Sequence, residues 1–227
     1  MFLYSARAWT GSARAFAAAG RGLGARGHQV TFVCPGGGAV EARAAAEGCD
    51  VIGLDPGGSL PLRTWRLQRI LSERFIEAVF VHTEPEQLAI SVAMRLAGRG
   101  GVVRRVPAGT VPAIGRGTRL ALRLATGGFV CTDAADARPL EAVRRARPPI
   151  VADIGVDPER YEELRAASLT TIGAPAGARV IVCLYEVSQR ARVATALRTI
   201  ALLAPRHPDL HLAIMGAAGM QPGFRPA

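Results

Sequence analysis

The sequence predicts an α/β protein whose parallel sheet is flanked by helices. Short apolar segments alternate with longer helix-like segments along the chain, which is the order of consecutive βα units. The apolar segments are continuous, which is typical of strands buried on both faces of a parallel sheet. Apolar residues make up 49% of the 227 residues, so the chain has enough apolar side chains to fill such a core.

The opening of the chain is the clearest βαβ unit. A strand at residues 2–4 leads into the turn Thr10-Gly11-Ser12, and an alanine-rich helix is expected over residues 13–26. Gly27 ends that helix, because glycine adopts the left-handed backbone conformation that closes many helices. A β-branched strand then runs over residues 30–34. Ser12 is the expected N-cap, and the same turn is a candidate anion site, since a helix start presents free N–H groups.

The remaining elements follow the same alternation. Further strands are expected at residues 51–54, 78–81, 102–106, 129–132, 150–152, 180–184 and 210–215. Further helices are expected at residues 39–47, 62–75, 86–96, 118–124, 139–145 and 193–204. This order predicts a doubly wound, Rossmann-like sheet with helices on both faces.

A change of composition near residues 158–177 predicts a domain boundary. Residues 158–164 suggest a short helix, and the Gly- and Pro-rich residues 173–177 suggest a linker. We therefore expect an N-terminal Rossmann-like domain over residues 1–172 and the start of a second over residues 173–227. Two strands and one helix cannot cover both faces of a sheet, so we expect the second domain to be incomplete and the chain to be truncated.

Composition narrows the classes of partner. The net charge of +10 comes from arginine alone, since the sequence contains no lysine. The arginines are spread along the chain and aromatic residues make up only 5%, which argues against nucleic-acid binding. Peripheral contact with an anionic membrane surface stays open. No apolar stretch is long enough to span a membrane and no secretion signal is visible, so we expect a cytoplasmic protein.

Two patterns that could indicate cofactors do not predict them here. The four cysteines form no CxxC pair, so we expect free thiols and no metal site. Residues Gly22 to Gly27 match G-x-G-x-x-G, but a dinucleotide-binding loop must follow a strand and open a helix. Here the pattern closes a helix and precedes a strand, so a nicotinamide cofactor is not expected.

Polar residues after the central strands are candidate ligand-binding residues, because open α/β sheets bind ligands at the carboxyl ends of their strands. His82 and Glu84 follow the strand at 78–81 and could hold a substrate hydroxyl. Alternatively, Thr83 or Glu84 caps the next helix and His82 packs at the edge. Arg105, in the pair Arg104-Arg105, could hold a phosphate or carboxylate, or the pair could face solvent and a salt-bridge partner.

Arg190 occupies a similar place in the second domain. It lies at the expected start of the helix that follows the strand at 180–184, which is a favourable position for a diphosphate. The alternative is a solvated helix start without a ligand.

Several phrases together resemble glycosyltransferases of the family 4-like kind, which have two Rossmann-like domains in the B-type arrangement. The phrases are ARGHQVTFV, FVHTEPEQLAI, GVDPERYEEL and ALRTIALLAPRHPDLHLAIMG, and their order and spacing span nearly the whole chain. The resemblance implies transfer of a sugar from a nucleotide-sugar to a small-molecule or lipid-linked acceptor, with retention of anomeric configuration and without a metal. The nucleotide-sugar is then the donor substrate, and no separate cofactor is implied.

The resemblance also suggests a role for each candidate residue. The Gly11-Ser12 backbone would face the donor phosphates, and His82 or Glu84 would orient the acceptor. Arg190 would stabilise the departing diphosphate. Gly216 and Gly219, after the last strand, would shape the nucleotide pocket.

The chain departs from the family pattern at several of these places. The first loop has Gly11-Ser12 where the family usually has Gly-Gly, and Arg190 stands where the family has a phosphate-binding lysine. The segment that carries the family's paired glutamates is missing. Two other interpretations therefore stay open: a non-catalytic remnant that binds an acceptor or a partner, and a sugar-nucleotide epimerase.

Overall fold

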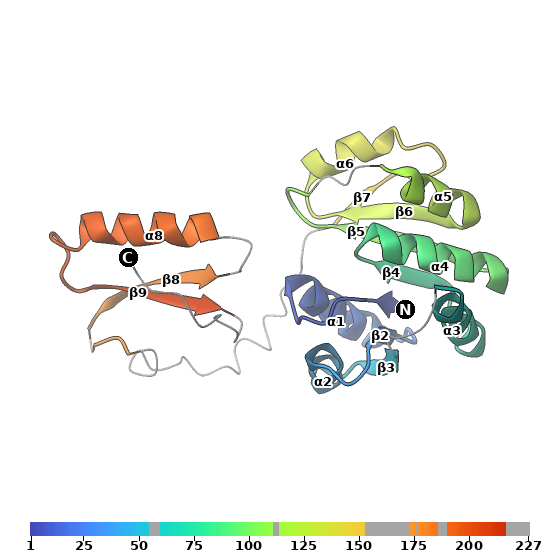
Figure 1. Ribbon diagram of the computed structural model, residues 1–227, viewed down its shortest axis with the longest axis horizontal. Helices are drawn as coiled ribbons and strands as arrows, with labels where there is room; N and C mark the ends of the chain where they lie inside the picture. Colours follow the sequence, from blue (N-terminus) through green and yellow to red (C-terminus); the bar gives the residue numbers. More distant parts are fainter. Residues whose placement is uncertain (55–59, 111–113, 153–172, 176, 186–189, 217–227) are drawn as a thin grey trace. The chain divides into compact units, whose positions relative to one another are not determined.

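The computed structural model describes residues 1–54, 60–110, 114–152, 173–175, 177–185 and 190–216 (Figure 1). The chain divides into two compact units, Met1–Asp157 and Pro158–Ala227, and each is described by itself. The boundary predicted between residues 172 and 173 borders the stretch 153–172, which lies outside the described residues, so it stays a prediction. The helix expected at 158–164 lies in the same stretch.

The described part of the first unit forms a seven-stranded sheet in which every pairing is parallel. Its strand order is β3-β2-β1-β4-β5-β6-β7, which confirms the predicted Rossmann-like sheet. The strands are β1 (Phe2–Leu3), β2 (Thr31–Pro35), β3 (Asp50–Leu54), β4 (Ala78–Val81), β5 (Gly101–Val106), β6 (Thr126–Cys131) and β7 (Ile150–Val151).

Helices connect these strands and cover both faces of the sheet (Figure 1). They are α1 (Gly11–Gly24), α2 (Ala39–Ala46), α3 (Leu60–Glu73), α4 (Glu84–Ala97), α5 (Arg116–Leu124) and α6 (Ala134–Glu141). The Gly22 to Gly27 pattern spans the end of α1, and Gly27 has a positive φ of 87°. It therefore closes a helix, as the sequence predicts.

The central strand β1 shows why its apolar run is continuous. Met1 and Leu3 pack against residues of α3 and α4, whereas Phe2 and Tyr4 pack against residues of α1 and α2. Successive strand residues point to opposite faces, so a strand with helices on both faces needs apolar residues at every position.

Two element boundaries differ clearly from the sequence prediction. The helix expected at residues 139–145 is α6, at Ala134–Glu141. Asp133 caps its start by accepting a hydrogen bond from the Ala135 N–H at 2.7 Å, and Pro139 lies inside the helix instead of opening it. Strand β6 begins at Thr126, three residues before the expected Phe129. Its parallel pairing to β5 includes two glycines, which have no apolar side chain by which the sequence could reveal a strand.

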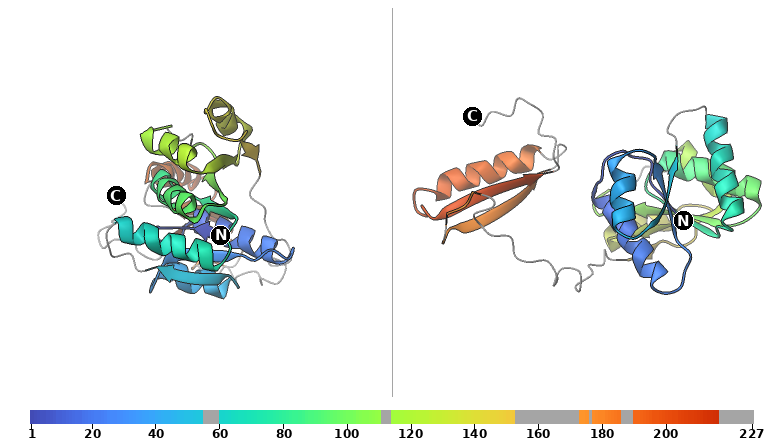
Figure 2. Two further views of the ribbon diagram at one scale, coloured as in Figure 1. Left: turned by 90° about the vertical axis from the view of Figure 1, so that its right-hand side faces the viewer. Right: turned by 90° about the horizontal axis from the view of Figure 1, so that it is seen from below.

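The second unit contains β8 (Arg179–Tyr185), α8 (Arg190–Leu203) and β9 (Leu210–Gly216). Its two strands pair in parallel, and α8 lies against one side of them (Figure 2). Ile181 and Val182 on β8 stay 43% and 52% exposed, and Ile214 and Met215 on β9 stay 40% and 47% exposed. The described part of the second unit is thus a small two-stranded sheet, and the expectation that this domain is incomplete stays a prediction.

All four cysteines are free thiols, and two of them, Cys34 and Cys131, are buried. No helix in the described part of the chain is long and apolar enough to cross a membrane.

Candidate functional site

The sheet has a topological switch point between β1 and β4. From β1 the chain winds outward through β2 and β3, and it then returns to place β4 on the other side of β1. The loops that follow β1 and β4 therefore leave the sheet in opposite directions. Such a divergence leaves a crevice at the carboxyl ends of the strands, where open α/β proteins bind ligands.

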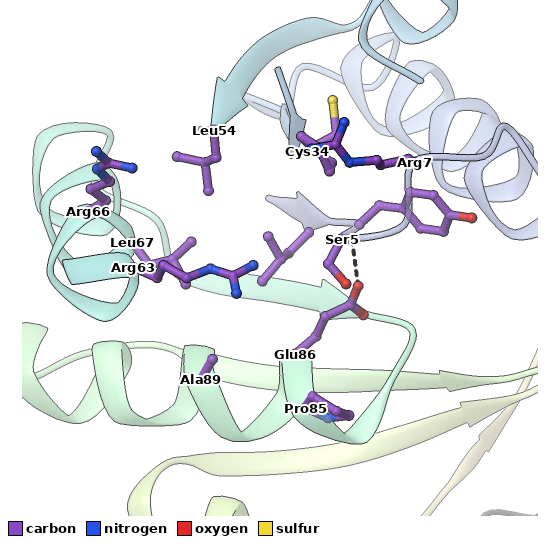
Figure 3. A pocket seen from close by; sticks show the side chains of 13 residues that line it. Ser5, Arg7, Cys34, Leu54, Arg63, Arg66, Leu67, Pro85, Glu86 and Ala89 are labelled. Carbon is purple, nitrogen blue, oxygen red and sulfur yellow. Dashed lines mark hydrogen bonds between the residues drawn. The ribbon is translucent and has the colours of Figure 1, made fainter. Parts of the chain in front are cut away.

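Glu86 holds these two loops together. Its Oε1 atom accepts a hydrogen bond from the Ser5 N–H at 2.6 Å (Figure 3), and its Oε2 atom accepts from the His82 and Thr83 N–H groups at 2.9 and 2.8 Å. Thr83 is the N-cap of α4 and forms a capping box with Glu86. The glutamate is only 5% exposed, so its charge is balanced by backbone donors and not by water.

Glu86 was not among the residues predicted for the site, although the sequence contains a pattern that indicates its capping role. Thr83-x-x-Glu86 before an apolar helix is the pattern of a capping box. This pattern predicts the cap of α4. It does not predict the hydrogen bond from the Ser5 N–H to Glu86, because Ser5 lies 81 positions away along the chain.

A hollow of about 420 Å³ lies beside this switch point, and we call it the switch-point pocket. It is lined by Ser12, His82, Thr83, Glu84, Arg104, Arg105, Val106, Pro107 and Thr110. The fold thus brings together four of the residues singled out from the sequence: Ser12, His82, Glu84 and Arg105. Gly11 adjoins Ser12, and a Cβ at Gly11 would have no atom within 4 Å, so the backbone there is open to approach.

His82 is the residue best suited to proton exchange in the switch-point pocket. Its ring stacks on that of Tyr4 with centroids 6.2 Å apart, and its Nδ1 atom is buried without a hydrogen-bond partner among the described residues. Burial lowers the pKa of His82 below its usual value, and Arg105 and Arg104 lower that pKa further against the opposing effect of Glu86. The imidazole is therefore neutral at pH 7, and it can accept or donate a hydrogen bond.

The two arginines of β5 are held on opposite sides of the strand. Arg104 donates to Thr118 Oγ1 of α5 at 3.4 Å, and Arg105 donates to Ser12 Oγ of α1 at 3.3 Å. Burial lowers the pKa of both guanidinium groups, but arginine titrates so far above pH 7 that both stay charged. These charges make the pocket favourable for an anion or for an electron-rich oxygen.

Glu84 has a structural partner on a neighbouring helix. Its Oε1 atom accepts a hydrogen bond from the Thr118 N–H at 3.1 Å, in the first turn of α5. The N-cap of α5 is Gly115, whose own side chain cannot cap, and a Cβ there would lie 3.1 Å from Glu84 Oε1. Glu84 therefore caps α5. The sequence had left two other roles open for Glu84: contact with an acceptor, or a cap on its own helix. Its role toward an acceptor stays a prediction.

The start of α1 corrects the expected N-cap. The helix begins at Gly11 with Thr10 as N-cap, so Ser12 lies in the first turn and is not the cap. Thr10 makes no side-chain capping bond, because its hydroxyl pairs with the Tyr4 hydroxyl at 2.8 Å. The first N–H groups of α1 consequently have no side-chain cap from Thr10, which suits a helix start that meets an anion.

Two candidate residues of the second unit, Arg190 and Gly216, lie in its described part. Arg190 is the first residue of α8, and Gly216 is the last residue of β9, where it pairs with Tyr185 at the end of β8. Gly219 lies outside the described residues. Within the described ranges, no group of three or more His, Cys, Asp or Glu side chains could hold a metal ion.

The chain matches the glycosyl transferase 4-like domain family over residues 10–137. No curated protein sequence matches it. A glycosyltransferase from Rickettsia africae superposes with a TM-score of 0.65 at 11% identity, over 96% of this chain and 68% of that protein. Anabaena HepE in complex with UDP-glucose superposes with a TM-score of 0.62 at 14% identity, over 95% of this chain and 68% of that protein.

A Listeria monocytogenes protein assigned as a UDP-N-acetylglucosamine 2-epimerase superposes with a TM-score of 0.64 at 12% identity. The superposition covers 98% of this chain and 62% of that protein. At these identities the superpositions show a shared fold. The chain spans roughly two thirds of the length of these structures.

Proposed function

Because the chain belongs to the glycosyl transferase 4-like family, we propose that it supplies the acceptor-side domain of a glycosyltransferase that uses a nucleotide-sugar donor. The observation that carries this proposal is the switch-point pocket, where a neutral imidazole and two guanidinium groups meet the start of α1. UDP-sugars are the first donors to test, since HepE of the same fold is found with UDP-glucose.

In the proposed reaction, the bond between the anomeric carbon and the diphosphate oxygen breaks, and a bond to the acceptor oxygen forms. His82 accepts a hydrogen bond from the acceptor hydroxyl and orients its oxygen toward the sugar. It takes up the hydroxyl proton as that oxygen bonds to the anomeric carbon, and the diphosphate leaves with the electrons of the broken bond. The start of α1 at Gly11 and Ser12, together with Arg105, faces donor phosphate oxygens. The anomeric configuration is retained and no metal takes part, as the family resemblance implies.

The second unit would stabilise the leaving group. Arg190 begins α8, so a guanidinium and a helix start would both meet the departing diphosphate, whose charge grows as the bond breaks. Gly216 and Gly219 would leave room for the nucleotide.

The test is UDP release and UDP-sugar binding by the whole chain, with a panel of UDP-sugars as donors. We expect His82→Gln to lower UDP release by about 10²-fold or more and to leave donor binding nearly unchanged, because it removes a group that acts on the acceptor. The matched control is His28→Gln, which changes an exposed histidine before β2. Equal activity of the His82 and His28 variants would exclude His82 from the site.

Arg190→Ala tests the leaving-group role. We expect weaker binding of UDP and of UDP-sugars, and unchanged binding would remove Arg190 from the site. Conversion of a UDP-sugar to its epimer without any acceptor would favour the epimerase interpretation. Acceptor binding without turnover of any donor would favour the non-catalytic remnant.

A further inference from the structure

Tyr4 contacts groups on two sides of the switch-point pocket, although it does not line that pocket itself. It directly follows β1 and is only 2% exposed. Its ring stacks on that of His82 with centroids 6.2 Å apart, and it meets the ring of Phe16 of α1 edge-on at 6.5 Å. These contacts fix the ring, so they also fix the place of the Tyr4 hydroxyl.

The Tyr4 hydroxyl bonds two groups of the loop that leads to α1. It donates to the Ala8 carbonyl at 3.2 Å, and it pairs with the Thr10 hydroxyl at 2.8 Å. A hydroxyl has one hydrogen to donate, so the hydrogen shared with Thr10 comes from Thr10. Burial raises the pKa of the Tyr4 phenol above its usual value, so Tyr4 keeps the hydrogen that it donates to Ala8.

The start of α1 lacks a side-chain cap although a residue suited to capping is in place. Thr10 is the N-cap, and its backbone is extended, with φ of −107° and ψ of 177°. A threonine at this position usually accepts a hydrogen bond from the second or third N–H of the helix, here Ser12 or Ala13. The Arg14 N–H bonds back to the Thr10 carbonyl at 3.0 Å. Among the described residues, the N–H groups of Gly11, Ser12 and Ala13 have no acceptor.

This helix start borders the switch-point pocket. Ser12 lines the pocket, and Arg105 donates to Ser12 Oγ there at 3.3 Å. Free N–H groups beside a guanidinium attract an anionic oxygen. A Thr10 hydroxyl turned onto the helix start would bond one of the same N–H groups and would occupy the place of that oxygen. The cap and an anionic ligand therefore compete for the same donors.

We propose that Tyr4 is a positioning residue of the switch-point pocket, whose hydroxyl holds Thr10 away from the start of α1 and so keeps the N–H groups there free for phosphate oxygens. Its ring supports the imidazole of His82, so one buried side chain positions a donor-facing and an acceptor-facing group. The inference rests on the proposed function for the identity of the ligand, a nucleotide-sugar diphosphate. The hold of Tyr4 on Thr10 does not depend on that identity.

The test measures UDP binding to the whole chain by calorimetry in a cycle of variants. Tyr4→Phe keeps the ring and frees Thr10 to cap α1, so UDP binding is expected to weaken by about fivefold, the ratio that corresponds to the free energy of an N-cap. Thr10→Val removes the competing hydroxyl, so the double variant Tyr4→Phe/Thr10→Val is expected to regain most of the wild-type affinity. A purely structural role of Tyr4 predicts no such recovery, and a double variant that binds UDP as weakly as Tyr4→Phe would overturn the proposal.

Ser72→Ala is the control for loss of a hydroxyl elsewhere. Ser72 Oγ accepts a hydrogen bond from Gln68 Nε2 at 3.1 Å on α3. Its removal does not alter the start of α1, so UDP binding is expected to stay at the wild-type level. A loss in Ser72→Ala equal to that in Tyr4→Phe would show that the effect is not specific to Tyr4 and would overturn the proposal.

Amide hydrogen exchange without ligand separates this inference from the proposed function. In Tyr4→Phe, the amide of Ser12 or Ala13 should exchange more slowly than in the wild type because Thr10 caps it, and Thr10→Val should reverse this change. Unchanged exchange at both amides in Tyr4→Phe would overturn the inference whether or not UDP binds. Slower exchange in Tyr4→Phe together with no UDP binding by the wild type would refute the UDP site and still support the hold of Tyr4 on Thr10.

Discussion

At the scale of single residues, the switch-point pocket contains polar groups that lack the hydrogen bonds or helix caps usual for them. The Nδ1 atom of His82 is buried without a partner among the described residues. Thr10 gives its hydroxyl to Tyr4 instead of capping α1. A buried polar atom without a partner costs free energy, so such an atom in a pocket points to a ligand that completes the hydrogen bonding.

The lowered pKa of His82 predicts how stability depends on pH. The unfolded chain gains a proton on this imidazole below about pH 6.5, whereas the folded protein keeps the imidazole neutral to lower pH. Protonation therefore favours the unfolded state, and the free energy of unfolding should fall as the pH drops below about 6.5. Urea titrations at several pH values measure this effect. As the pH drops below about 6.5, we expect the unfolding free energy of His82→Gln to fall by less than that of the wild type. An unchanged dependence in His82→Gln would contradict the prediction.

Gly11→Ala separates stability from ligand approach. A Cβ at Gly11 would meet no atom within 4 Å, so the protein should keep its stability or gain up to about 1 kcal/mol. If a donor phosphate approaches this backbone, the added methyl group should still weaken UDP-sugar binding. Gly24→Ala, at the other end of α1 and equally open, is the matched control. Unchanged UDP-sugar binding by Gly11→Ala would show that the helix start does not contact the donor.

At the scale of elements, the loops of the site are fixed by caps that cross from one element to another. Glu86 belongs to α4 but holds the loop after β1, and Glu84 belongs to α4 but caps α5. The start of α4 therefore positions two neighbouring segments, so a change there is expected to affect the whole switch-point pocket.

Glu84 can be assigned by a pair of substitutions. Glu84→Ala removes the acceptor for the Thr118 N–H and should lower the unfolding free energy by about 1 kcal/mol. Glu84→Gln keeps an oxygen at that position and should cost less. Chemical denaturation measures both variants, and UDP release measures their activity. If Glu84→Gln keeps both stability and activity, Glu84 acts only as a cap, and if it keeps stability but loses activity, the carboxylate acts on the substrate.

At the scale of the whole molecule, the two units differ in how completely they bury their strands. Val79 and Val81 of β4 are fully buried between helices, whereas Ile181 and Val182 of β8 stay about half exposed. A two-stranded sheet with one helix gains little free energy from burial. Local opening should therefore be easier in the second unit than in the first.

Hydrogen exchange of the whole chain tests this difference. Backbone amides in β8 and β9 are expected to exchange markedly faster than those in β4 and β5, because less apolar burial opposes their opening. Addition of UDP should slow exchange at the carboxyl ends of β8 and β9 if this unit binds the nucleotide. Equal protection of the two sheets would contradict the predicted difference in stability.

The alternation of strands and helices and the parallel sheet could be predicted from the sequence. A strand covered on both faces must be apolar at every position, as in β1 and β2, so its pattern is visible locally. The sequence prediction was wrong at α6, because the predicted helix began at Pro139, which in the structure lies inside the helix. It also missed the glycine-rich start of β6. The sequence also indicated most of the switch-point pocket, because His82 follows β4 and Arg105 lies near the end of β5, and the carboxyl ends of these strands share one edge.

The partners of these residues, in contrast, are set by the three-dimensional packing of the chain. The contacts of Glu86 with Ser5, of Arg105 with Ser12, and of Glu84 with Thr118 join positions 81, 93 and 34 residues apart. Contacts of this kind are set by strand order and by the directions of the helices that follow the strands. Those features depend on the packing of the whole sheet, and no local pattern of residues encodes them.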